Sequence, residues 1–205
     1  MLDAATIFLS AFLLFQVQLI LAKALLPWFG GTPAVWTTCM MFFQVLLLGG
    51  YAYAHGLAAR LTSRRQAMVH MAVVAISALS LAAFAWMWAC PLLPSVDWRP
   101  DDPTQPIQSL AWLLGLAVGL PFFVLSATSP LLQRWIADRA GQPPYRLYAV
   151  SNAGSLAGLL SYPVLVEPFL NLHQQAWIWA GAFVLFAAGV IAAAVRTLKP
   201  APAPK

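Results

Sequence analysis

Apolar residues run through this chain in six long stretches that are separated by short polar connections. The stretches cover residues 4–26, 34–59, 67–93, 107–132, 148–170 and 176–198. Each exceeds the roughly 20 residues that a helix needs to cross the hydrocarbon core of a bilayer. We therefore expect an all-α polytopic membrane protein, in which residues 1–198 form one domain of six transmembrane helices and residues 199–205 form a Pro/Ala-rich cytoplasmic tail.

The basic residues predict how these helices are oriented. Nine of the eleven Lys and Arg residues lie after, or in the last residues of, the second, fourth or sixth stretch, namely Arg60, Arg64, Arg65, Arg134, Arg139, Arg146, Arg196, Lys199 and Lys205. Of the other two, Lys23 lies near the end of the first stretch and Arg99 lies in the connection after the third stretch, which also carries Asp101 and Asp102. Because basic residues in short loops stay on the cytoplasmic side, both termini are predicted to be cytoplasmic.

Composition narrows the class of function. With 61% hydrophobic and 8% charged residues, the chain has little left for a soluble domain. The net charge of +5 comes from arginines in loops, not from a basic face with interleaved aromatics, so no nucleic-acid partner is expected. The spacing of His55, His70 and His173 does not suit a metal, and no catalytic triad or phosphate loop is present. We expect no catalytic residue, cofactor or metal in these residues.

A weak internal repeat suggests how the six helices are arranged. A shift of about 111 residues pairs Lys23 with Arg134, Gly30 with Gly141, Pro33 with Pro144, Thr37 with Tyr148, Gln44 with Ser155 and Tyr51 with Tyr162. Three helices separate the partners, so the two halves would enter the membrane in opposite orientations. Such a 3+3 inverted repeat builds each six-helix half of the major facilitator fold.

Polar side chains form stripes on two of the predicted helices. Gln44 lies on one face of the second helix with Thr37 and Tyr51, and the fifth helix carries Tyr148, Asn152, Ser155 and Tyr162 on one face. In lipid such stripes turn inward, where they either hydrogen-bond between helices or line a wet cavity. The stripes are therefore either packing contacts or part of a substrate-binding site.

Two charged residues inside predicted spans complete the candidate site. Lys23 could pair with Glu167, bind an anionic group, or extend its ammonium to the outer headgroups. Glu167 lies between Pro163 and Pro168, and it could bind a proton or an organic cation, or cap the outer surface near His173. The candidate substrate-binding residues are Glu167, Tyr148, Asn152, Ser155, Tyr162, Gln44 and Lys23.

The fourth stretch contains residues that disturb a helix. Gly115, Gly119, Pro121 and Pro130 fall within it. Proline removes a backbone donor and clashes with the preceding turn, so we expect a kinked or broken helix here.

One short segment resembles a signature of the major facilitator transporters. Their loop between the second and third helices reads G-x-L-A-D-R-x-G-R-[KR], and this chain matches it at Gly56, Leu57, Ala58, Arg60, Arg64 and Arg65. The chain departs from the signature at Ala59, where that family has Asp, and at Ser63, where it has Gly. In the family this Asp takes part in charge contacts that help to set the inward or outward state, so its loss puts a conventional alternating-access cycle in doubt.

A longer resemblance covers nearly the whole chain. Segments 27–39, 42–55, 125–135 and 145–156 resemble the N-terminal membrane region of bacterial fused major facilitator/spermidine synthase-like proteins. The resemblance implies a module of the bacterial inner membrane that is not catalytic by itself. It would anchor, or exchange small molecules such as polyamines with, a cytoplasmic aminopropyltransferase-like partner or domain. The alternatives are a half-size transporter that acts as a homodimer and a structural subunit of a membrane complex.

Overall fold

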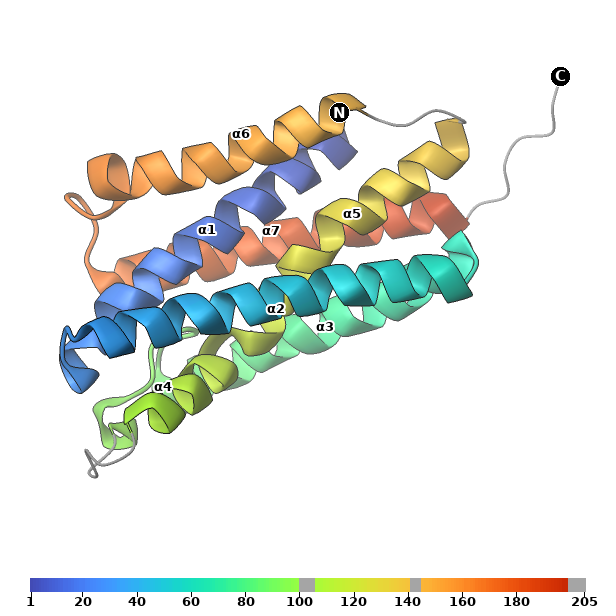
Figure 1. Ribbon diagram of the computed structural model, residues 1–205. Coiled ribbons are helices and arrows are strands. Elements are labelled where there is room, and N and C mark those ends of the chain that lie inside the picture. The colour runs from blue at the N-terminus through green and yellow to red at the C-terminus, as the bar shows by residue number, and fades with distance from the viewer. Residues whose placement is uncertain (100–105, 141–144, 199–205) are drawn as a thin grey trace, which may run out of the picture.

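The computed structural model describes residues 1–99, 106–140 and 145–198 and forms an elongated helical bundle (Figure 1). Within these ranges no strand occurs. The helices are α1 (Leu2–Phe29), α2 (Pro33–Arg60), α3 (Ser63–Trp88), α4 (Pro106–Leu114), α5 (Leu120–Ala140), α6 (Tyr145–Ser161) and α7 (Leu172–Leu198), with a short 3₁₀ helix η1 (Val96–Trp98) and two π-helical turns, η2 (Gly115–Gly119) and η3 (Tyr162–Val166).

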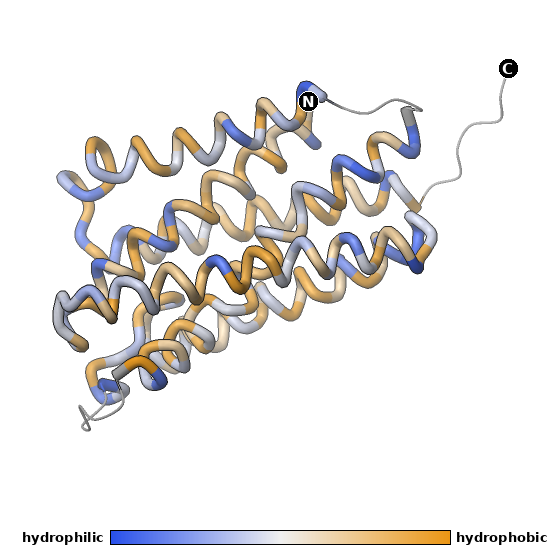
Figure 2. The backbone as a smooth tube through the Cα atoms, in the orientation of Figure 1, coloured by the Kyte–Doolittle hydropathy of each residue, from blue (hydrophilic) through white to orange (hydrophobic). Residues whose placement is uncertain are grey.

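Among the described residues, six helices are long and apolar enough to cross a membrane, which confirms the predicted all-α class and the predicted number of long apolar helices. Four of them are α1, α2, α3 and α7; α4, η2 and α5 form one continuous helix over Ile107–Arg139, and α6 with η3 forms another over Tyr145–Val166. Hydrophilic positions concentrate toward the two ends of the bundle, with hydrophobic ones between them (Figure 2). Length and composition thus indicate a membrane protein. The predicted tail 199–205, the loop residues Asp101 and Asp102, and the repeat positions Gly141 and Pro144 lie outside the described residues.

The third helix is shorter than its apolar stretch predicts. It ends at Trp88, and Ala89 follows in the left-handed region with a φ of 55°. Pro91 explains the end, because a proline disfavours helical geometry at the residue before it and removes a backbone donor. Cys90 and Leu92 are nevertheless buried, so this apolar segment packs onto the bundle without being helical.

Two π-helical turns lie beside prolines. Pro121 follows η2, and Pro163 lies inside η3. A π turn widens the helix by one residue, which is one way to accommodate the missing donor of a proline. The disturbance expected in the fourth stretch is therefore a local widening at η2, since the helix continues through Pro130 to its end.

The first helix is the centre of the bundle. It packs against α5, α6 and α7, and residues such as Val17 and Leu21 on it are fully buried. Two glycines of α6 allow a close approach: a Cβ at Gly154 would collide with the carbonyl oxygen of Phe8, and one at Gly158 would lie 2.7 Å from that of Phe12. Small residues four apart permit such backbone contact between membrane helices.

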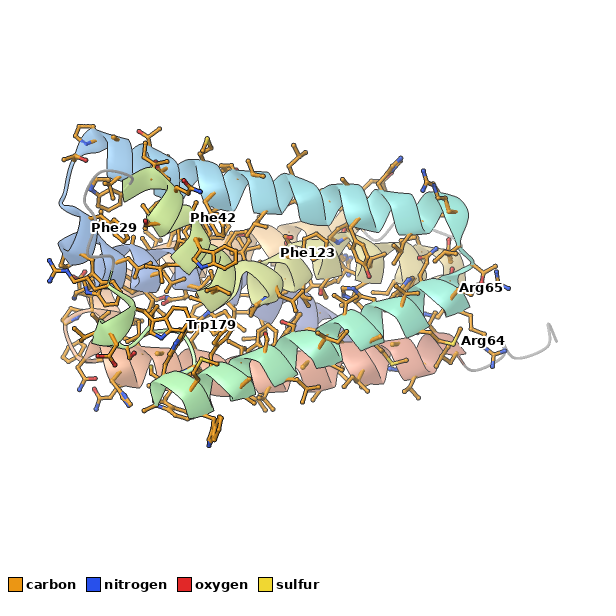
Figure 3. The ribbon with its side chains drawn as sticks, turned by 90° about the horizontal axis from the view of Figure 1, so that it is seen from below. Phe29, Phe42, Arg64, Arg65, Phe123 and Trp179 are labelled. Carbon is orange, nitrogen blue, oxygen red and sulfur yellow. The ribbon has the colours of Figure 1, made fainter. Side chains whose placement is uncertain are left out.

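Hydrogen bonds between helices add to this packing. On the other side of α1, the indole of Trp179 donates to the Leu13 carbonyl at 2.9 Å and points into the bundle from α7 (Figure 3). This bond ties α7 to the middle of α1, and it satisfies a donor that would otherwise be buried without a partner.

A buried polar cluster joins α3 to α5. Trp135 is fully buried, and its Nε1 donates to Gln66 Oε1 at 2.9 Å. His70 Nε2 lies 3.0 Å from Thr128 Oγ1, which itself donates to the Val124 carbonyl at 2.7 Å. With its hydroxyl hydrogen donated to Val124, Thr128 Oγ1 can accept a hydrogen bond from the Nε2–H tautomer of His70.

One end of the bundle is basic, and we call it the basic end. This end contains the start of α1, the α2–α3 turn, the end of α5, the start of α6 and the end of α7 (Figure 1). Arg64 and Arg65 mark it in Figure 3. Seven cations belong to these segments: Arg60, Arg64, Arg65, Arg134, Arg139, Arg146 and Arg196. The connections that carry most of the basic residues in the sequence therefore lie at the same end of the bundle, as the sequence predicts.

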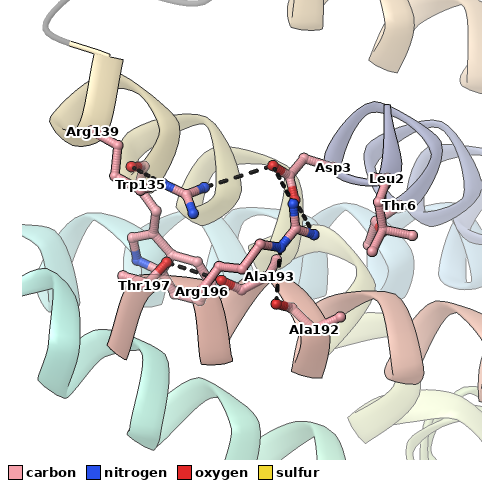
Figure 4. A network of polar contacts seen from close by, with 9 residues as sticks. All are labelled: Leu2, Asp3, Thr6, Trp135, Arg139, Ala192, Ala193, Arg196 and Thr197. Carbon is pink, nitrogen blue, oxygen red and sulfur yellow. Dashed lines mark hydrogen bonds and ion pairs between the residues drawn. The ribbon is translucent and has the colours of Figure 1, made fainter. Parts of the chain in front are cut away.

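An ion-pair network at the basic end joins three helices (Figure 4). Asp3 Oδ1 lies 3.0 Å from Arg196 Nη2, and Asp3 Oδ2 lies 3.6 Å from Arg139 Nη2. Asp3 is in the first turn of α1 and the two arginines are in the last turns of α5 and α7, so all three charges suit their helix dipoles. The side chains remain partly exposed, which limits the stabilisation to about 1 kcal/mol.

Candidate functional site: the face between α2 and α6

The outlying helices α2 and α6 border an indented face of the bundle. Because α2 packs mainly on α5 and α6 mainly on α1, the space between α2 and α6 is floored by α1 and α5. Two pockets lie on this face, which we call the open face. One is near the end opposite the basic end, and the other lies closer to the basic end.

The pocket closer to the basic end is rich in hydroxyl groups, and we call it the serine pocket. Its volume is about 310 Å³. Side chains from α1, α2, α5 and α6 line it, and the polar ones are Ser10, Tyr51, Ser126, Ser129, Ser151, Asn152 and Ser155. This is a dense set of hydrogen-bonding groups for a position between spanning helices.

Three serines of the serine pocket present oxygen atoms rather than hydrogens. Ser126 Oγ donates to the Phe123 carbonyl at 2.8 Å, Ser10 Oγ to that of Ile7 at 2.9 Å, and Ser155 Oγ to that of Ser151 at 3.2 Å. A hydroxyl has one hydrogen and two lone pairs, so these serines can still accept hydrogen bonds. The pocket is thus uncharged, and these three oxygen atoms suit a ligand with N–H donors.

The second pocket surrounds an ion pair, and we call it the ion-pair pocket. Lys23 Nζ of α1 lies 2.8 Å from Oε1 of Glu167, and the two side chains are 41% and 44% exposed. The pocket has a volume of about 550 Å³ and is otherwise mainly apolar and aromatic; it is lined by Leu19, Ala22, Lys23, Leu26, Pro27, Trp36, Leu159, Tyr162, Pro163 and Glu167. Of the alternatives for Lys23, the structure shows the one in which it pairs with Glu167.

The π turn η3 places Glu167 beside this pocket. In an α-helix, two residues five apart differ by about 140° around the axis. In η3 the Glu167 backbone N–H donates to the Tyr162 carbonyl at 2.8 Å, an i→i+5 bond that widens the turn. The wider turn brings Glu167 and Tyr162 onto the same side of the chain. Glu167 is the first residue after the candidate span Tyr145–Val166.

The candidate residues fall into three groups. Lys23, Tyr162 and Glu167 line the ion-pair pocket, and Asn152 and Ser155 line the serine pocket. Gln44 and Tyr148 are exposed and line neither pocket. The Tyr162 ring is buried, and its hydroxyl donates to Gln175 Oε1 on α7 at 3.2 Å.

Several residues of the open face were not candidates from the sequence. Ser126 and Ser129 of α5 line the serine pocket, and Ser129 Oγ donates to Ser151 Oγ at 3.3 Å across to α6. In the sequence, the two serines are three residues apart and so lie on one helix face just before Pro130, which is the pattern that could have identified them. Gln16 of α1 donates to the Gly158 carbonyl and to Ser161 Oγ, both at 2.8 Å, and so holds α6 in place between the two pockets.

Comparison with other proteins assigns no family. We find no match of the chain to a protein-family model, a curated protein or a solved structure. Within the described ranges, no three His, Cys, Asp or Glu side chains are grouped so that they could hold a metal ion. The chemistry of the two pockets is therefore the basis on which a function can be proposed.

Proposed function

We propose that the chain is half of a transport unit in the bacterial inner membrane, and that its open face forms one wall of a path for a small organic solute. A second six-helix unit, in the simplest case a second copy of this chain, covers the face. The observation that carries this proposal is the serine pocket. Polar groups that face lipid are costly, so a face that combines hydroxyl, amide and charged groups favours contact with water or protein.

The helix contacts support an arrangement in two inverted halves. If α1, α2 and α3 correspond to the fourth, fifth and sixth spans, the contact of α1 with α6 corresponds to that of α5 with α2. Likewise the contact of α1 with α7 corresponds to that of α5 with α3, and both pairs are present. This agreement favours the 3+3 inverted repeat of the major facilitator half-fold, in which binding sites lie where the repeats meet.

A second candidate function rests on the sequence motifs. As a membrane module of spermidine synthase-like proteins, the chain would exchange polyamines with a cytoplasmic aminopropyltransferase-like partner. The acceptor oxygens of the serine pocket are compatible with the N–H groups of a polyamine. Lys23 is already paired with Glu167, however, so a polyamine at this carboxylate would add positive charge beside the Lys23 ammonium.

The transport proposal is tested by solute uptake into vesicles that contain the purified chain. Asn152→Leu should fill part of the serine pocket and reduce uptake of leucine, ethanolamine or spermidine at least tenfold, because a filled pocket excludes the solute. Tyr148→Leu is the matched control, since Tyr148 lies one turn away on α6 but outside the pocket, and it should transport as wild type does. Wild-type vesicles that take up none of the three solutes, or a strictly monomeric chain in the membrane, would contradict the proposal.

Topology gives a second prediction. The basic end should face the cytoplasm, because its seven described arginines resist translocation. A reporter enzyme fused after Lys205 should therefore be active in the cytoplasm, and one inserted next to Asp97 should be active in the periplasm. The opposite pattern would reverse the orientation of both pockets.

A further inference from the structure

We propose that the ion-pair pocket binds a zwitterion, a molecule that carries an ammonium group and an anionic group beside an apolar body. This inference deepens the proposed function, because it names the class of ligand at one end of the open face. The ligand class proposed here differs from the polyamine, a polycation, that the sequence motifs suggest.

The ion pair itself favours a ligand that carries both a positive and a negative charge. A purely cationic ligand at Glu167 would lie beside the Lys23 ammonium, and a purely anionic ligand at Lys23 would lie beside the Glu167 carboxylate. Either ligand would place two like charges next to each other, which is unfavourable. A zwitterion instead aligns against the pair, so that its ammonium meets the carboxylate and its anion meets the ammonium.

Both partners have hydrogen-bonding capacity left for such a ligand. A lysine ammonium has three N–H donors and a carboxylate has two oxygens, whereas the pair uses one contact between Nζ and Oε1. The side chains are close to half exposed, so a ligand can reach them without opening the bundle. The remaining contacts would be charge-assisted hydrogen bonds, which are the stronger kind.

The other walls of the pocket suit an apolar body next to an ammonium. Trp36 of α2 contributes a large aromatic surface, and ammonium groups are attracted to the faces of indole rings. The hydroxyl of Tyr162 is already bonded to Gln175, so the ring is what Tyr162 offers to the pocket. Leu19, Leu26 and Leu159 supply aliphatic surface. The volume of about 550 Å³ is within the range of small-molecule sites, roughly 300–1,000 Å³.

Two sources can supply this chemistry. One is a free zwitterion of low mass, such as an apolar α-amino acid. The other is the headgroup of a zwitterionic phospholipid, because the pocket lies at the end of the bundle, where headgroups are found. Both carry an ammonium and an anion on an apolar body, so the experiment has one arm for each.

The test measures equilibrium binding to the purified full chain in detergent, without flux. Leucine is compared with isopentylamine, which lacks the carboxylate, and with 4-methylpentanoate, which lacks the ammonium. In the second arm, phosphatidylethanolamine is compared with phosphatidylglycerol of the same acyl chains. We expect saturable binding of leucine or of phosphatidylethanolamine that is at least about tenfold tighter than that of its singly charged counterparts.

Variants link this binding to the ion pair. Glu167→Gln and Lys23→Gln should each weaken binding of the zwitterion about tenfold or more, because each removes one charge-assisted contact. The exchanged variant Lys23→Glu/Glu167→Lys keeps a pair and should restore part of the binding. Arg134→Gln is the matched control, since it breaks the exposed pair with Asp138 at the other end of the bundle and should bind as wild type does.

The possible results separate this inference from the transport proposal. Binding of isopentylamine or spermidine as tight as that of the zwitterions would overturn the inference and favour a cation site. Absence of zwitterion binding, or binding that Glu167→Gln leaves unchanged in folded protein, would also overturn it. Because no vesicle or second unit is needed, a failure here leaves the uptake experiment with Asn152→Leu as an independent result.

Discussion

Trp135→Ala should destabilise the bundle by about 3–5 kcal/mol, the range for removing a fully buried aromatic side chain. Trp135 is 0% exposed at the contact of α3 and α5. Its loss leaves a cavity and also removes the donor to Gln66 Oε1, which is buried and would have no replacement. Thermal unfolding of the purified chain in lipid nanodiscs measures the effect.

Two control variants show which part of the indole is responsible. Trp86→Ala removes a side chain of the same type that is 89% exposed on α3, and it should change stability by about 0.5 kcal/mol or less. Trp135→Phe keeps most of the volume but loses the donor, so it should fall between the two. Equal stabilities for Trp135→Ala and Trp86→Ala would show that the α3–α5 contact contributes little to the bundle.

Gly154→Leu should detach α6 from α1, with a loss of about 3 kcal/mol. A Cβ at this position meets the Phe8 carbonyl oxygen and lies 3.2 Å from Ala11 Cβ. The obstacle is helix backbone, which cannot rotate away as a side chain can. Because α6 packs mainly on α1, it has no comparable second surface on which to settle. Reduced thermal stability and faster proteolysis near residues 145–161 are the expected measurements.

Gly181→Leu provides the control for this prediction. Gly181 lies inside α7, and a Cβ there meets nothing within 4 Å. Leucine is a better helix former than glycine by up to about 1 kcal/mol, so this variant should be neutral or more stable. If Gly154→Leu behaved in the same way, the close contact between α6 and α1 would be wrong.

Spans and charge distribution were predictable because both depend on local composition. A run of more than 20 apolar residues specifies a membrane helix whatever it packs against. The third helix shows the limit: an apolar run predicts burial, which Leu92 confirms, whereas Pro91 decides where the helix ends. The prolines were visible in the sequence, but the left-handed turn at Ala89 was not.

The candidate site was predictable only in part, since contacts between distant helices depend on their rotation and depth. Lys23 and Glu167 are 144 residues apart, and their pairing was one of several alternatives from the sequence. The π turn at η3 changes the register after Tyr162, which α-helical periodicity cannot anticipate. The ion pairs of Asp3 with Arg139 and Arg196 could not be predicted either, because the two arginines lie at the ends of two other helices.

The central position of α1 has a consequence for biosynthesis. Helices enter the membrane in the order of translation, so α1 is made first, whereas α5, α6 and α7, against which it packs, are made last. Until then, Gln16 lacks its acceptors Gly158 and Ser161, and Asp3 lacks its arginines. Nascent chains that stop before residue 120 should therefore expose these groups of α1, and we expect the insertion machinery to shield this helix until the second half has been made.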